Sequence, residues 1–203
     1  MGAAARALLG EVAGSDDGAL VLGTGGFVVV PTGRMPRGAA GLLTSVLYED
    51  REGPVYALEG TVHGLASGIV EAGRRGGWEK LPVERIAARS GGAARSPRVV
   101  AALEGTGTPD WDPASRFEVE AGEFTPEEIV RGTLDDLASR FGTIVELLRA
   151  ADSHPPRFVA TGGLAMSPHL TARIGQAAAT PVAIDPLPHR TAVGAALLAR
   201  DGR

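Results

Sequence analysis

The chain is predicted to fold as an α/β domain with a mixed sheet flanked by helices, and three observations support this. Residues 20–60 hold four short β-branched and aliphatic runs separated by turn residues, as in an antiparallel meander. Strand-like and helix-like runs then alternate toward the C-terminus. The 203 residues, 44% of them hydrophobic, suffice for one sizeable core. We therefore expect one domain.

The meander comes first. Residues 20–30 read as two strands joined tightly at Gly23-Thr24-Gly25-Gly26, with a turn after them at Pro31-Thr32-Gly33. Residues 41–50 and 53–60 read as two further strands joined by a charged turn.

The second half begins with a glycine-broken helical pattern from Thr61, a loop over residues 88–97 and a strand over residues 98–105. A long helix is then expected over residues 126–149, because Thr125 and Glu128 form a capping box around a proline and apolar residues follow at helical spacing. The remaining elements are a strand in "RFVATGG", a helix opened by Ser167-Pro168, a short buried strand in "PVAID" and a closing helix in "TAVGAALLAR".

Composition argues against several classes of partner. The net charge is -4 with a pI near 5.6 and no basic stripe, so nucleic acid is not an expected partner. There is no cysteine, which excludes disulfides, zinc-thiolate sites and thiol nucleophiles. No run approaches about eighteen apolar residues, so we expect no membrane contact and a cytoplasmic location.

The tetrad Gly23-Thr24-Gly25-Gly26 allows two interpretations. It is either a hairpin turn whose glycines supply positive φ, or a loop whose backbone N–H groups converge on an anion, with the Thr24 hydroxyl as a further donor. It lacks the lysine of a Walker loop and the strand–glycine–helix order of a dinucleotide fingerprint. The loop alone leaves both open.

A second glycine pair, Gly162-Gly163, follows a predicted strand and precedes the helix that Ser167 opens. This is either an ordinary turn with Ser167 as N-cap, or a turn where a planar ring or a phosphate approaches the backbone.

Other candidate groups favour structural interpretations. Asp110-Trp111-Asp112 is a carboxylate pair or, as we favour, a turn. Asp135-Asp136 is expected on a solvated helix face, and Trp78 and Trp111 are expected to pack. The four histidines show no ligand spacing, so no metal site is expected.

The motifs taken together resemble one family along residues 1–203. In order, "LGTGGFVVVPTG", "GLLTSV", "VYALEG", "EGTGTPDWDPASR", "EEIVRGTLDDLASR", "VATGGLAMSPHL" and "AVGAALLA" resemble the C-terminal half of FGGY carbohydrate kinases, particularly glycerol kinase-like members. The resemblance implies an actin-like ATPase (ribonuclease H-like) domain that closes with a second domain on ATP and a sugar or polyol. It implies that residues 1–19 are a remnant of the interdomain hinge helix.

The same resemblance assigns roles to both turns. Gly23, Thr24 and Gly25 resemble the loop that contacts the β- and γ-phosphates of ATP, whereas Gly162, Gly163 and Ser167 resemble the adenosine-binding turn. The implied cofactor is ATP, as Mg-ATP in a complete kinase.

Departures from the family pattern imply lost activity. Ala3 occupies the position of the catalytic aspartate, and Ala66 and Val70 those of a glycine and a glutamine that approach the nucleotide. "EVEAGEF" replaces a "GLT" segment, and His189-Arg190-Thr191 stands where an acidic residue is frequent. We therefore expect neither a catalytic residue nor a magnesium ligand among the 203 residues of the chain.

The family's first domain has no counterpart in the 203 residues. The chain is therefore expected to be the nucleotide-binding half of a kinase, inactive alone because phosphoryl transfer depends on positioning between two domains. Expected partners are ATP or ADP, and either the missing N-terminal domain or a second copy on an apolar docking surface. A non-catalytic regulatory module and half of a split kinase are the alternatives.

Overall fold

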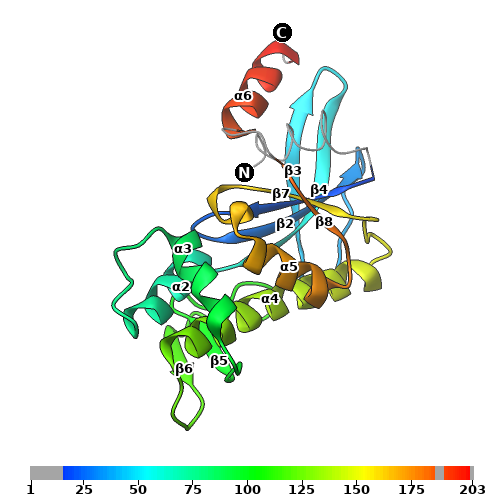
Figure 1. The fold of residues 1–203 in the computed structure, drawn as a ribbon. Coiled ribbons are helices and arrows are strands. Elements are labelled where there is room, and N and C mark those ends of the chain that lie inside the picture. The colour runs from blue at the N-terminus through cyan, green and yellow to red at the C-terminus, as the bar shows by residue number, and fades with distance from the viewer. Residues whose placement is uncertain (1–15, 186–189, 202–203) are drawn as a thin grey trace.

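A computed structural model describes residues 16–185 and 190–201 (Figure 1). Six strands form one mixed sheet in the order β3-β4-β2-β1-β7-β8. The four predicted antiparallel strands are confirmed as β1 (Gly18–Leu22), β2 (Gly26–Gly33), β3 (Leu43–Asp50) and β4 (Gly53–Val62). They do not form the predicted meander, because β4 lies between β2 and β3 and pairs with both. The later strands β7 (Phe158–Thr161) and β8 (Val182–Ile184) extend the sheet in parallel.

Helices flank this sheet, as predicted. The α-helices are α2 (Leu65–Arg74), α3 (Val83–Ala88), α4 (Pro126–Ala150), α5 (Pro168–Ala178) and α6 (Arg190–Asp201), and the 3₁₀ segments are η2 (Arg89–Gly92) and η3 (Gly163–Met166). α4 and α5 cover one face of the sheet, whereas α6 packs beside β3 at the opposite end of the molecule (Figure 1). A second sheet, β5 (Val99–Ala102) with β6 (Arg116–Val119), packs against α4.

The long helix α4 begins as its sequence predicts. Glu128 N–H donates to Thr125 Oγ1 at 3.3 Å, and Thr125 N–H donates to Glu128 Oε2 at 3.0 Å, which completes the capping box. Its apolar positions form one fully buried stripe, which includes Leu134, Leu137, Phe141, Ile144 and Leu148. This stripe supplies the helical side of the core.

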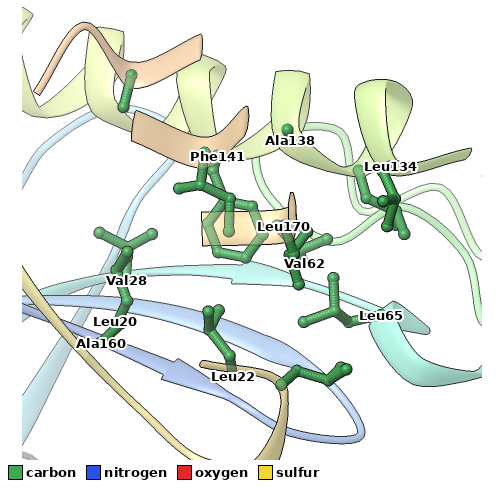
Figure 2. Packing of buried hydrophobic residues seen from close by; sticks show 14 of the residues in the cluster. Leu20, Leu22, Val28, Val62, Leu65, Leu134, Ala138, Phe141, Ala160 and Leu170 are labelled. Atoms are coloured by element: carbon green, nitrogen blue, oxygen red, sulfur yellow. The ribbon is translucent and has the colours of Figure 1, made fainter. Parts of the chain in front are cut away.

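The main core lies between α4 and the sheet. Phe141 projects from α4 toward Leu20, Leu22 and Val28 (Figure 2). A Cβ on Gly26 would lie 2.4 Å from the Phe141 ring, so this glycine of the tetrad is needed for core packing. A smaller cluster on the other sheet face contains Ala19, Val29, Leu47, Ala57 and Val159.

Several sequence predictions are corrected. Pro31-Thr32-Gly33 is not a turn after β2 but its last part, where the register with β4 shifts; such an irregularity tolerates a proline without an N–H. "PVAID" contains a strand, but β8 is an edge strand and Ile184 is 41% exposed. The strand expected over residues 98–105 is shorter in the structure, where it is β5 (Val99–Ala102), and its partner strand β6 was not predicted.

The boundaries of the glycine-broken region also shift. β4 continues to Val62, so the helix begins only at Leu65, and the predicted loop over residues 88–97 contains η2. The expectations for Ala3 and His189 lie outside the described residues, as does most of the proposed hinge remnant; β1 itself begins at Gly18. Within the described parts of the chain, no helix combines the length and apolar character needed to span a bilayer.

Candidate nucleotide-binding site

The two glycine turns lie side by side at the carboxyl ends of two neighbouring strands. β1 and β7 are parallel neighbours, with Val21 opposite Thr161, so the turns that follow them leave the sheet together. In open α/β sheets, ligands bind at such carboxyl ends of strands. Gly162 has φ +101°, and a Cβ there would lie 2.2 Å from the Leu22 carbonyl oxygen. Only glycine therefore lets the second turn contact the end of β1.

The turn between β1 and β2 is held in place by two backbone hydrogen bonds. Gly23 N–H donates to Gly25 O at 3.0 Å, and Ala66 N–H, at the start of α2, donates to Thr24 O at 3.1 Å. The Thr24 side chain is exposed. The turn is thus a true hairpin connection, and it is fixed against α2 with its outer side facing solvent.

Neither packing nor backbone conformation within the chain requires glycine at Gly23 or Gly163. A Cβ on either would meet no atom within 4 Å, and neither residue has a positive φ. Gly38, between β2 and β3, shares these properties and provides a control position. Open backbone at both turns fits a planar or anionic ligand that must approach the main chain closely.

Ser167 acts as the N-cap of α5. Its hydroxyl accepts from Leu170 N–H at 3.4 Å, and its side chain is almost fully buried. The N-cap interpretation of this residue is therefore confirmed. Its role in adenosine binding stays a prediction, and the exposed large side chain nearest to it in the chain is that of Met166.

The two departures on α2 have structural roles. The Ala66 N–H holds the Thr24 carbonyl, and Val70 packs half-buried against the main core. One turn away, Ser67 Oγ donates to Glu104 Oε1 at 2.8 Å and links α2 to the loop after β5. Val70 therefore contributes packing at the position where the family resemblance implies a polar amide.

A second Gly-Thr-Gly segment, Gly105-Thr106-Gly107, supports the same end of the sheet, a structural role that the sequence analysis did not predict. Thr108 N–H donates to Thr61 O at 2.9 Å, and Thr61 N–H donates to Thr108 Oγ1 at 3.0 Å. The repeated tripeptide was the signal that could have pointed to it.

The same loop continues into Asp110-Trp111-Asp112, where the predicted turn is confirmed and the predicted packing of Trp111 is corrected. Asp112 accepts from Arg116 at 2.6 Å and from Ala114 N–H at 2.9 Å, and these hydrogen bonds lower the pKa of its carboxyl group. The segment is thus a turn, as favoured. Trp111 is 40% exposed and meets the His63 ring edge-to-face at 5.7 Å, so it is only partly packed.

The acidic pair on α4 is more than a solvated face. Asp136 accepts from Ala101 N–H at 3.1 Å and from Arg140 at 2.7 Å, and Asp135 pairs with Arg173 of α5 at 2.6 Å. These carboxylates tie α4 to β5 and α5. Among the described residues, no group of three or more potential ligand side chains is placed to hold a metal ion.

Comparison with known proteins identifies the family. A model of the C-terminal domain of the FGGY family of carbohydrate kinases matches residues 18–200. The chain belongs to this family. Glycerol kinase from Thermus brockianus is 32% identical over 198 residues, a match that covers 94% of the chain and 39% of that protein. Glycerol kinase 1 from Lactiplantibacillus plantarum is 33% identical over 133 residues, covering 63% of the chain and 26% of that protein.

Solved structures show the same fold. Plasmodium falciparum glycerol kinase, determined with ADP, superposes with a TM-score of 0.79 at 22% identity over 97% of the chain and 40% of that structure. Xylulose kinase from Rhodospirillum rubrum gives a TM-score of 0.78 at 21% identity, over 98% and 40%. The actin-like ATPase fold predicted for this FGGY domain is confirmed. The chain spans about two fifths of the length of these proteins.

Proposed function

We propose that this FGGY domain binds ATP or ADP as the nucleotide-binding half of a carbohydrate kinase. Gly23, Thr24 and Gly25 would receive the β- and γ-phosphates, and Gly162 and Gly163 the adenosine, with Ser167 fixing the second turn. The observation that carries this proposal is the pairing of two open glycines, Gly23 and Gly163, on adjacent turns of one sheet edge.

The chemistry of each turn suits its assigned part of the nucleotide. The Gly23 N–H donates to Gly25 O, so the donors proposed for phosphate are the N–H groups of Thr24 and Gly25 and the rotatable Thr24 hydroxyl, with the side-chain-free Gly23 leaving room for approach. The base turn leaves its backbone open to a flat ring at Gly163. Magnesium would neutralise the phosphates in a complete kinase, and we propose that its ligands are not supplied by this chain.

The reaction of the whole protein would be phosphoryl transfer from ATP to a hydroxyl group of a sugar or glycerol. We propose that this chain does not catalyse it alone, since transfer requires groups positioned from both sides of the nucleotide. Val70, half-buried against the core, favours the alternative of a non-catalytic binding module. The proposed partner is an N-terminal kinase domain or a second copy of the chain.

Titration with Mg-ATP tests the nucleotide site, by calorimetry or ligand-observed NMR. We expect a Kd in the millimolar range, about 4 kcal/mol of binding free energy, because one domain leaves the phosphates open to water. Gly23→Ala and Gly163→Ala should each weaken binding about tenfold or more, since a methyl group blocks approach to the backbone. Gly38→Ala is the matched control and should bind like the wild type. Equal affinity in all four proteins would contradict the proposed site.

A coupled assay of ADP release tests the second part of the proposal. With glycerol or xylulose as acceptor, we expect no release above the rate without acceptor. Acceptor-dependent ADP release by the chain alone would show that one domain suffices for transfer.

A further inference from the structure

The side chains that the proposed base turn exposes to solvent are apolar. Within residues 161–168 the exposed residues are Gly162, Gly163, Met166 and Pro168, and only the last two carry side chains beyond the backbone. Met166 is 60% exposed at the end of η3, while the preceding Leu164 and Ala165 are buried. The turn therefore presents a thioether and a proline ring to solvent.

The polar side chains of this turn are committed elsewhere. The Ser167 hydroxyl caps α5 and is 2% exposed, and Thr161 is buried at the end of β7. His169, one position into α5, packs over η2, where a Cβ on Gly91 would lie 3.2 Å from its Cε1. The two hydroxyls are therefore buried away from a nucleotide base, and the partly exposed His169 ring lies against η2.

We propose that Met166 is the residue that stacks on the nucleotide base, and that this domain binds adenine and guanine nucleotides with similar affinity. The inference rests on the proposed function and adds base selectivity to it. Thioether groups contact aromatic faces favourably, and every base has such a face. A site that hydrogen-bonds its ligand rejects an analogue strongly, whereas contact with an apolar surface discriminates weakly.

Titrations with ADP, GDP and inorganic tripolyphosphate test this in the wild type, Met166→Ala and Met35→Ala. Met35 is the matched control, an exposed methionine (75%) in the loop after β2. We expect ADP and GDP to bind the wild type within about threefold of each other. Met166→Ala should weaken both by the same factor, about two- to tenfold, and leave tripolyphosphate binding unchanged. Met35→Ala should change none of the three.

The outcomes separate this inference from the proposed function. If neither the nucleotides nor tripolyphosphate bind, the proposed function fails and the inference fails with it. If they bind but ADP is preferred over GDP by more than tenfold, only the inference is overturned; a hydrogen-bonding group then reads the base, for instance Glu84 or Arg85 on α3, which packs against η3. Unchanged nucleotide affinity in Met166→Ala would also overturn it.

Discussion

The tripeptide Gly-Thr-Gly occurs twice in this domain, and the two copies differ in every structural respect. In residues 105–107 both glycines have positive φ, +79° and +77°, and a Cβ on either would lie within 2.3 Å of a backbone oxygen. In residues 23–25 neither glycine has a positive φ, and Gly23 has free space around it. The threonines differ likewise: Thr106 Oγ1 accepts from Asp112 N–H, whereas Thr24 faces solvent.

The comparison shows that a glycine motif has no fixed meaning. Residues 105–107 need glycine because the chain packs against itself, on Thr61 and Asp112. Packing within the chain makes no such demand at Gly23, and the demand proposed there comes from the nucleotide. Open space at a glycine with ordinary φ is shared by Gly38, so what distinguishes Gly23 is its place beside Gly163 on the neighbouring turn.

Gly107→Ala should have the largest effect on stability. A Cβ would lie 2.2 Å from Thr61 O in a backbone conformation that L residues rarely adopt, so the loop must move away from β4. We expect a loss of about 3 kcal/mol or more in the free energy of unfolding, or failure to fold. Urea denaturation followed by circular dichroism measures it. A loss below about 1 kcal/mol would mean that the two segments are not as different as their packing indicates.

Thr106→Val and Thr24→Val compare the two threonines. Valine keeps the shape but removes the acceptor for Asp112 N–H, so the first variant should lose about 1 kcal/mol. The second should stay within about 0.5 kcal/mol of the wild type, because its side chain is exposed. Chemical denaturation of both variants in one buffer gives the difference directly. Equal losses of stability in the two variants would contradict the different roles assigned to the two threonines.

Asp112→Asn should reveal a pH dependence confined to the packed loop. Hydrogen bonds from Arg116 and Ala114 lower the pKa of the Asp112 carboxyl group, so its stabilising effect is complete above the ordinary aspartate value near 3.9 and is lost as the pH falls through the lower folded value. The stability difference between wild type and variant should be largest near pH 6 and shrink below about pH 4. Unfolding curves at pH 6, 4.5 and 3.5 would show this. A difference independent of pH would refute it.

Gly23→Ala should have the smallest effect on folding. The methyl group enters open space at an ordinary φ, so the free energy of unfolding should change by less than about 0.5 kcal/mol. Any change should be a slight rise, because alanine lowers the conformational entropy of the unfolded chain. Thermal and urea unfolding beside Gly38→Ala would check it. A marked destabilisation would show that the turn needs glycine for its own structure, and the argument for a ligand would lose its basis.

Local signals in the sequence predicted the elements that local physics determines. The capping box and apolar spacing located α4 almost to the residue, and the tetrad with its flanking aliphatic runs located the β1–β2 hairpin. β6 was missed because four residues of mixed polarity carry no clear period. β8 was placed in the interior because an apolar run does not reveal whether a strand lies at the edge of the sheet.

The candidate site depended on resemblance, since its geometry is not local. Nothing in either turn indicates that β1 pairs with β7, or that Gly162 rests on the Leu22 carbonyl. Both an N-cap role and an adenosine-binding role were predicted for Ser167, and its burial and the hydrogen bond from Leu170 confirm the N-cap role. The His63–Trp111 contact joins residues from separate segments and left no pattern in the sequence.

The pairing of β1 with β7 also bears on how this domain folds. The Arg157 side chain donates to the Asp17 carboxylate at 2.9 Å, and these two residues are 140 positions apart in the sequence. The adjacent strands β1 and β7 are separated by the same long stretch of chain. Contacts of such large sequence separation slow folding, because the entropy of the intervening chain is lost before they form. During synthesis the β1–β2 hairpin leaves the ribosome before residues 158–161, and β1 stays without this neighbour until they follow. Nascent chains that end before Phe158 should therefore hold a completed β1–β2 hairpin beside an unpaired strand edge, the state most exposed to misassembly.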